Sequence, residues 1–147
     1  MIHEGAHDLP ADLLHHPEQR LWVRMDPDSG RARIGLDAVG LAALGDVVFV
    51  ALDPSETELR PGSPFGTLEA AKMTSTLLAP IGGRVVACND AVVADPSLLG
   101  NAPYTDGWLL ELEPATWAQD SSALLGGSDA EAWARAEWAR LDEEETG

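Results

Sequence analysis

The chain has one cysteine and few basic residues among its 147 residues. Cys88 cannot form an internal disulfide, so any redox chemistry has to come from a cofactor or another protein. Lys and Arg together number 9 against 25 Asp and Glu, which gives a formal net charge of -16. That charge repels nucleic-acid phosphates and anionic membrane surfaces. We therefore exclude nucleic acid as a partner and expect docking partners with a basic rim.

Long hydrophobic runs are also missing. The longest apolar stretch, residues 38–52, contains Asp46 and two glycines and is too short to span a bilayer. The first residues include His3, Glu4 and Asp8 where a secretory signal would be basic. We expect no membrane insertion, and the lone cysteine favours a reducing, cytoplasmic location.

No arrangement of nucleophile, acid and base appears in the sequence. No Ser-His-Asp triad, phosphate loop or paired catalytic carboxylates can be assembled from motif spacing, so we do not expect an enzyme. His3 and His7 lie four residues apart and His15 and His16 are adjacent. Such a set would suit a metal only on a helix, so we expect solvated histidines and no metal. Cys88 has no activating neighbour in sequence, and we expect a buried structural thiol.

The chain divides into three parts. Residues 1–20 mix acids, histidines and prolines and are expected to form a loose N-terminal arm, with one helical turn at most. Residues 21–120 alternate short β-prone runs with turn residues, which predicts a mainly β domain. Residues 121–147 form a linker and a C-terminal helix. The strands are predicted at residues 21–25, 32–35, 47–52, 65–70, 73–78, 84–89 and 108–112.

Helices are predicted at the edges of the β domain. A short helix over residues 38–44 begins after Asp37 as N-cap and ends before Gly45. Ser128 and Glu131 form a capping box at the start of the C-terminal helix. An apolar stripe follows this helix at steps of three and four: Ala130, Trp133, Ala134, Trp138 and Leu141. We expect this stripe to pack on the β domain; a partner-binding helix is the alternative.

Lys72 is the single lysine of the chain. The extended segments 65–70 and 73–78 are separated only by Ala71 and Lys72, which is the spacing of a tight hairpin. A carrier lysine must be reached by several enzymes, and a hairpin tip provides exposure and fixed geometry. The other basic residues are all arginine, which cannot form the amide bond of such a carrier. An ordinary solvated turn lysine is the alternative.

The residues around Lys72 resemble a known attachment site. The segment 66–73, Gly-Thr-Leu-Glu-Ala-Ala-Lys-Met, with the Leu-Ala-Pro at 78–80 and Gly83, resembles the lipoyl-attachment hairpin of the glycine cleavage system H protein family. Residues 44–50 resemble a characteristic strand of the family. Residues 61–66 and 101–108 are similar to its Gly-x-Pro-x-Gly and Pro-Tyr-x-x-Gly-Trp segments. The resemblance covers about residues 21–114, and the family also has a terminal helix.

This resemblance implies a fold and a cofactor. The expected fold is a lipoyl-type barrel-sandwich hybrid, mainly β, with short peripheral helices and a C-terminal helix. Lipoate would be bound covalently to Lys72, and the protein would be a swinging-arm carrier on which partner enzymes act. Those partners would include a lipoate ligase or lipoyl transferase, and dihydrolipoamide dehydrogenase is a further candidate. Glu69 is expected either to orient the ligase or to be a solvated strand residue.

The cargo of the arm has two candidates. In glycine cleavage the arm carries an aminomethyl group, whose ammonium needs acidic or polar groups. The family's His-Glu-Trp aligns with Arg20, Leu21 and Trp22, and an acidic position after the lysine holds Thr76. At both positions this chain lacks a carboxylate that could stabilise the ammonium group. We therefore favour the H-protein-like lipoate-binding proteins of heterodisulfide-reductase-like sulfur oxidation, whose arm works by thiol and disulfide exchange; glycine cleavage is the alternative.

Two further alternatives remain. The residues around Lys72 are also similar to the biotin-carrier motif, but Ala71 replaces the first of its two methionines. The flanking matches belong to H proteins, so lipoate is favoured over biotin. An unlipoylated interaction module that keeps the fold and uses its acidic surface is the last alternative.

Overall fold

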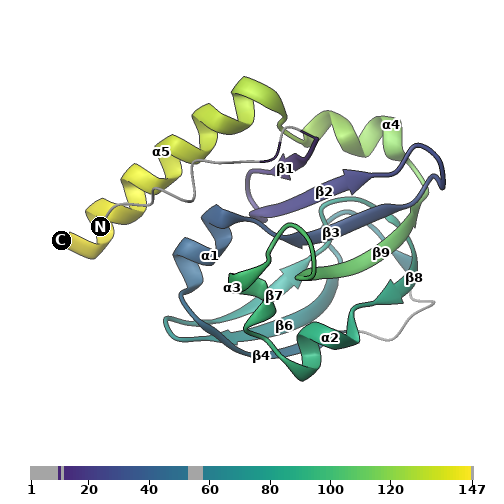
Figure 1. Cartoon of the computed structure of the whole chain (residues 1–147). Helices are drawn as coiled ribbons and strands as arrows, with labels where there is room; N and C mark the ends of the chain where they lie inside the picture. The colour runs from purple at the N-terminus through teal and green to yellow at the C-terminus, as the bar shows by residue number, and fades with distance from the viewer. Residues whose placement is uncertain (1–9, 11, 53–57, 147) are drawn as a thin grey trace.

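The strands of the protein form two antiparallel sheets (Figure 1). The structure is a computed structural model that describes residues 10, 12–52 and 58–146. The larger sheet has the strand order β1-β2-β3-β9-β8-β5. Its strands are β1 (Leu14–His16), β2 (Leu21–Met25), β3 (Ala32–Leu36), β5 (Glu58–Leu59), β8 (Gly83–Cys88) and β9 (Trp108–Pro114).

The smaller sheet carries the predicted hairpin. Its order is β4-β6-β7, so β6 is central and β4 and β7 are the two edges. The strands are β4 (Val47–Leu52), β6 (Pro64–Ala70) and β7 (Thr74–Leu78). Glu69 lies opposite Thr74 in the β6-β7 pair. This register leaves Ala71 and Lys72 at the tip, as predicted.

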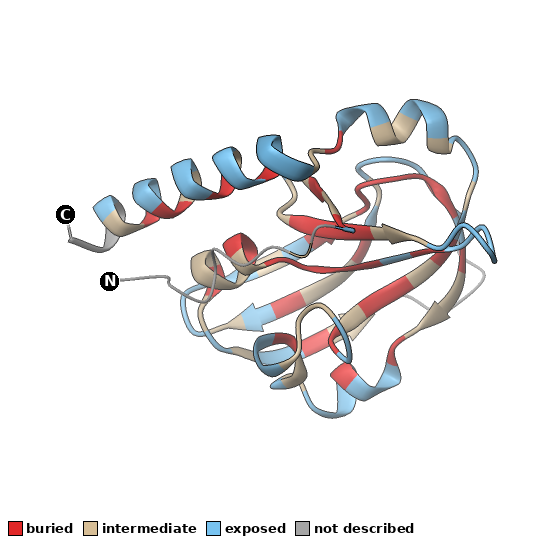
Figure 2. Cartoon of the chain, turned by 45° about the horizontal axis from the view of Figure 1, so that its top comes forward, coloured by how far each residue is buried: buried red, intermediate tan, exposed pale blue. Residues whose placement is uncertain are grey.

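Both sheets contribute to one main hydrophobic core. Phe65, Leu68 and Leu77 face it from the smaller sheet, and Ile34 and Leu110 face it from the larger one. All five side chains are buried. Figure 2, which colours each residue by its burial, shows buried residues on strands of both sheets. The mainly β architecture expected from the sequence is confirmed.

The helices lie at the periphery of the sheets (Figure 1). They are α1 (Ala38–Leu44), α2 (Asp90–Ala94), α3 (Leu98–Asn101), α4 (Trp117–Asp120), the short 3-10 helix η2 (Ser121–Ala123) and α5 (Gly127–Thr146). Helix α5 packs on α1, where Ala134, Trp138 and Leu141 cover Val39. Figure 2 shows the buried residues of α5 along one side of the helix. These residues belong to the stripe seen in the sequence, and the stripe packs on α1 and, through Trp133, against His15 of β1.

The described part of the N-terminal segment differs from the loose arm expected there. Residues Leu14–His16 form β1, which pairs with β2. The backbone of His15 also exchanges two hydrogen bonds with Leu125, each 2.8 Å long. The expectation of a solvated His15 was wrong, because its side chain is fully buried. Its partners are distant in sequence, so no local pattern could reveal them.

Trp22 anchors β2 under β3 at a glycine. A Cβ atom added to Gly35 would lie 2.3 Å from Cε2 of Trp22, so only glycine lets the indole approach this closely. The indole Nε1 donates a hydrogen bond to the Pro103 carbonyl at 2.8 Å. This bond ties β2 to the Pro-Tyr segment that precedes β9. Residues 101–108, which resemble the family motif, therefore have a structural role: they hold β2 in place through Pro103.

Two properties of the described residues bear on the expected function. No helix in this part of the chain combines the length and apolarity needed to cross a bilayer. Over residues 10, 12–52 and 58–146, no three His, Cys, Asp or Glu side chains gather as a metal site would require. His3 and His7 lie outside the described residues.

Candidate functional site

Lys72 lies at the exposed tip of the β6-β7 hairpin. The Ala70 N–H donates a hydrogen bond to the Met73 carbonyl at 2.9 Å, which closes the turn around Ala71 and Lys72. Neither tip residue has a positive φ. The tip is therefore a rigid two-residue turn, and its lysine points away from the core.

The end of α1 supports this tip. The Lys72 N–H donates to the Leu44 carbonyl at 3.1 Å, and the Ala71 N–H donates to the Asp46 carbonyl at 2.8 Å. The Lys72 ammonium, Nζ, donates to the Ala42 carbonyl at 3.2 Å. The last carbonyls of a helix have no partner within the helix and carry partial negative charge, so they suit an ammonium group. Helix α1 thus holds both the backbone and the side chain of Lys72.

Gly45 lies between the end of α1 and the tip of the β6-β7 hairpin. It ends the helix with φ of 79°, in the left-handed region that glycine favours, and its N–H donates to the Leu41 carbonyl. A Cβ at this position would be in ordinary van der Waals contact, 3.5 Å from the Ala71 Cβ and the Lys72 Cγ, so the φ angle rather than lack of space favours glycine. The sequence predicted Gly45 as a helix end, but not its contact with Lys72.

The start of α1 is held by two side chains from other elements. The Asp37 carboxylate accepts the Gly40 N–H at 2.9 Å through Oδ1, which caps the helix. Its Oδ2 lies 3.1 Å from His15 Nδ1. Since a carboxylate oxygen is the acceptor, Nδ1 is the donor of this bond. The pair is fully buried, so β1 and the cap of α1 form one unit.

Tyr104 provides the second support. Its hydroxyl oxygen accepts the N–H of Ala38, the first residue of α1, at 2.9 Å. Burial raises the pKa of the Tyr104 hydroxyl to about 12, against the opposing effect of the Ala38 N–H. Tyr104 therefore stays neutral throughout the physiological pH range. The Pro-Tyr segment thus acts on the lysine indirectly, through α1.

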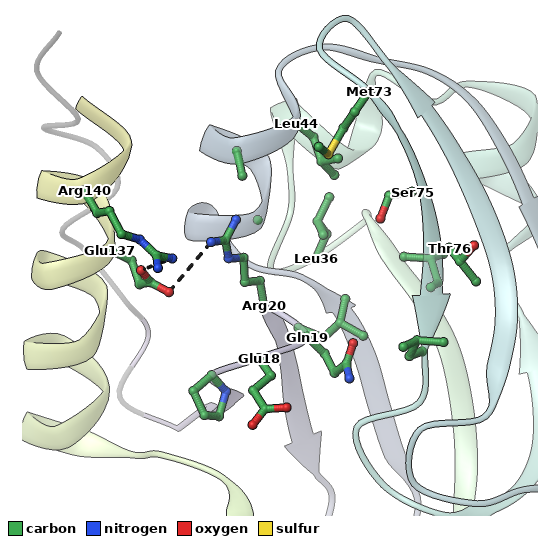
Figure 3. Close-up of a pocket in the computed structure, with 16 residues that line it drawn as sticks. Glu18, Gln19, Arg20, Leu36, Leu44, Met73, Ser75, Thr76, Glu137 and Arg140 are labelled. Atoms are coloured by element: carbon green, nitrogen blue, oxygen red, sulfur yellow. Dashed lines mark ion pairs between the residues drawn. The ribbon is translucent and has the colours of Figure 1, made fainter. Parts of the chain in front are cut away.

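A cleft of about 480 Å³ opens beside the hairpin (Figure 3). Its walls are the β1-β2 connection, α1, β7 and α5. Met73, next to Lys72, lies at one end of it. The cleft is therefore within reach of a flexible group attached to the tip.

Charged residues line one side of the cleft. Glu137 of α5 pairs with Arg20, at 3.7 Å, and with Arg140, at 2.5 Å. Both pairs are drawn as dashed lines in Figure 3. Glu18 adds a second, exposed carboxylate to the lining. The cleft thus contains two carboxylates and two guanidinium groups, although it lacks a carboxylate at position 21.

The two residues that depart from the family pattern both line the cleft. Leu21 is 1% exposed and makes an apolar part of the cleft wall. Thr76 is exposed on β7. Ser75 and Thr76 both line the cleft, and Figure 3 draws both among its lining residues. An acidic residue in place of Thr76 would therefore add a carboxylate to the cleft wall.

The structure also places the remaining candidates. Glu69 is exposed on β6, three residues before Lys72, opposite Thr74 on one side and Phe49 on the other. Cys88 ends β8 and is half-buried, whereas the sequence predicted a buried thiol. Cys88 lies on the other sheet from Lys72 and has no part in this site.

Comparison with known proteins decides the family. The sequence profile of the family described as "Glycine cleavage H-protein" matches residues 13–137. The chain belongs to the glycine cleavage H-protein family. Glycine cleavage H-proteins carry lipoate covalently on a lysine, and they are carriers rather than catalysts. The expectations of a lipoyl cofactor and of a protein that is not an enzyme are confirmed at the level of this family.

Individual relatives agree with this assignment. The glycine cleavage system H protein of Mycobacteroides abscessus is 44% identical over 117 residues, which is 80% of this chain and 88% of that protein. The one from Salinibacter ruber is 38% identical over 123 residues, 84% of this chain and 95% of that protein.

A solved structure has the same fold. The crystal structure of a glycine cleavage system H protein from Mycobacterium marinum matches with a TM-score of 0.67 and 33% identity, and covers 73% of this chain and 87% of the other. The lipoyl barrel-sandwich architecture is thereby confirmed.

Proposed function

We propose that this H-protein is lipoylated on Lys72 and carries the aminomethyl group between the enzymes of glycine cleavage. The observation that carries the proposal is the position of the chain's one lysine, exposed at the tip of a rigid hairpin in a protein of this family. Lipoate supplies a disulfide at the end of a long flexible arm. The protein supplies the amine at Nζ, the support from α1, and the neighbouring cleft.

The cargo follows from two considerations. The matched family and the relatives are named for glycine cleavage, which favours the second of the two cargo hypotheses over sulfur oxidation. The missing acidic residue at Thr76 is also offset by Glu18 and Glu137, which give the cleft two other carboxylates. Sulfur transfer stays a second candidate on one observation, the apolar Leu21 in the cleft wall.

The partners of this proposal act in sequence. A lipoate ligase or lipoyl transferase has to reach Nζ itself and form the amide. The glycine cleavage enzymes, with dihydrolipoamide dehydrogenase to reoxidise the arm, then need only its far end. Glu69 is proposed as a contact of the ligase, because it is exposed three residues from Lys72.

Attachment is tested by intact mass. The protein expressed with lipoate and a competent ligase should gain one lipoyl group, which peptide mapping should locate at Lys72. The variant Lys72→Arg keeps a cation that can still donate to the Ala42 carbonyl, but it cannot form the amide, so it should gain none and melt at the same temperature. If the wild-type chain stays unmodified with every ligase tried, the unlipoylated interaction module is the better interpretation.

Cargo is tested by reconstitution. Lipoylated protein mixed with the other glycine cleavage enzymes should support glycine decarboxylation, and Lys72→Arg should not. A lipoylated protein that fails this assay, yet exchanges sulfur with a heterodisulfide-reductase-like complex, would reject glycine cleavage in favour of sulfur oxidation.

A further inference from the structure

The exposed large apolar side chains of the described residues are few and are not scattered. They are Val48, Phe49, Met73 and Val93, which are 66%, 50%, 52% and 44% exposed. Val48 and Phe49 lie on β4, and Val93 lies on α2, which contacts β4. We call Val48, Phe49 and Val93 the β4 patch. Exposed apolar groups gathered in one region of a protein this acidic need an explanation, since single scattered ones would not.

A β-bulge creates the core of the β4 patch. Val47 lies opposite Ala70 and Phe49 lies opposite Glu69, so the register shifts between them and Val48 has no cross-strand partner. The bulge breaks the alternation of the strand and leaves two consecutive apolar residues exposed. Because β4 is an edge strand, its outer side is also open to another chain.

The β4 patch adjoins the lysine but lies across the sheet from the cleft. Val47 pairs with Ala70, two residues before Lys72, so Val48 is close to the hairpin tip. The cleft is bordered by β7, the opposite edge of the same sheet. A protein bound to the β4 patch would therefore leave the cleft open.

The charges around the β4 patch are acidic. Exposed carboxylates flank it at Asp46, Glu69 and Asp90. No lysine or arginine occurs in β4, β6, β7 or α2, and Lys72 lies in the turn between β6 and β7. A complementary partner has an apolar groove with Lys or Arg at its rim.

We infer that the β4 patch is the docking surface for the enzyme that acylates Lys72. This inference rests on the proposed attachment of lipoate at that residue. Before lipoylation the Lys72 amine extends from the protein by only one side chain. The acylating enzyme therefore has to contact the protein directly beside the hairpin tip. Enzymes that act on the finished arm meet its far end and can dock elsewhere. The occupant is thus an acyl-transferring enzyme with an apolar groove and a basic rim.

The test measures acylation of Lys72 at saturating lipoate while the concentration of the carrier is varied. Val48→Arg and Phe49→Arg remove apolar contact and add a charge of the same sign as the partner's rim. Each should raise KM about tenfold or more, the loss expected for a central interface residue, with kcat unchanged. Ala132→Arg is the matched control, an exposed apolar residue of α5 that does not line the cleft and gains the same charge. Its KM should stay within about twofold of wild type, the range of a rim charge.

Other results would overturn the inference. One is an equal KM for all three variants and wild type, with melting temperatures that show them folded. Another is a defect confined to glycine decarboxylation by carrier that has already been lipoylated, which would assign the β4 patch to a downstream enzyme. A wild-type dimer that Val48→Arg converts to a monomer would assign it to a second copy of the chain. If wild-type protein is not acylated at all, the proposed function fails, and this inference fails with it.

Discussion

Replacing Asp37 with alanine should destabilise the protein well beyond an ordinary surface change. The carboxylate does two things at once while fully buried: it caps α1 through the Gly40 N–H, and it accepts a hydrogen bond from His15 Nδ1. The other ring nitrogen of His15, Nε2, is buried and has no hydrogen-bond partner among the described residues. The variant would therefore leave both ring nitrogens of the buried His15 imidazole without a hydrogen-bond partner.

The magnitude follows from these two losses. Removing an N-cap carboxylate costs about 1 kcal/mol. Leaving a buried donor unsatisfied costs about 1–3 kcal/mol more. The sum is about 3 kcal/mol in the free energy of unfolding, which lowers the melting temperature of a chain of this length by about 6–12 °C.

Thermal and urea unfolding of the Asp37→Ala variant would measure this loss. Asp28→Ala is the control, because Asp28 is exposed in the turn between β2 and β3, and its stability should change by less than about 0.5 kcal/mol. In Asp37→Asn the amide oxygen can still cap α1, so this variant should fall between the two. Equal stabilities of Asp37→Ala and Asp28→Ala would refute the reasoning, since they would show that the buried pair contributes nothing.

Two further predictions concern the braces of α1 and β2. Tyr104 is the one tyrosine of the chain, so the ultraviolet absorbance of its phenolate should titrate near pH 12 instead of the ordinary 10.0. Because the folded pKa is the higher one, the contribution of Tyr104 to stability is complete below pH 10 and is lost as the pH rises to about 12; a midpoint near pH 10 in the folded protein would contradict this. Gly35→Ala should cost about 1–3 kcal/mol or more, because its Cβ would overlap Trp22. Gly100→Ala, in α3 with open space around it, should not destabilise; equal losses in both variants would exclude the close approach as the cause.

Local features of the fold could be predicted from the sequence because their causes are local. The β6-β7 hairpin follows from two β-prone runs with a two-residue gap, and α1 follows from Asp37 and Gly45 at its ends. The tip position of Lys72 came from the same spacing. The C-terminal helix came from the Ser128 capping box and an apolar stripe of helical period.

Features made by distant residues could not be predicted in this way. The segment around His15 has turn-prone and polar neighbours, so it indicated a loose arm, yet its backbone and side chain bind Leu125 and Asp37. The place of Thr76 in the cleft wall depends on how β7 lies beside α1, which a comparison of residue types does not contain. The support of Lys72 by carbonyls of α1 is likewise a contact between elements, and Gly45 was its only signal in the sequence.

The paired backbone of His15 and Leu125 has a practical consequence for anyone who shortens or fuses this chain. A segment near the start of the chain is hydrogen-bonded to one that follows the β strands, so a deletion that removes either segment breaks the same two hydrogen bonds. Leu13 is buried just before the paired His15, and Leu141 is buried farther on, in α5. An expressed fragment should therefore begin before Leu13 and extend past Leu141, and a version cut to the β strands alone would expose apolar surface at both ends at once.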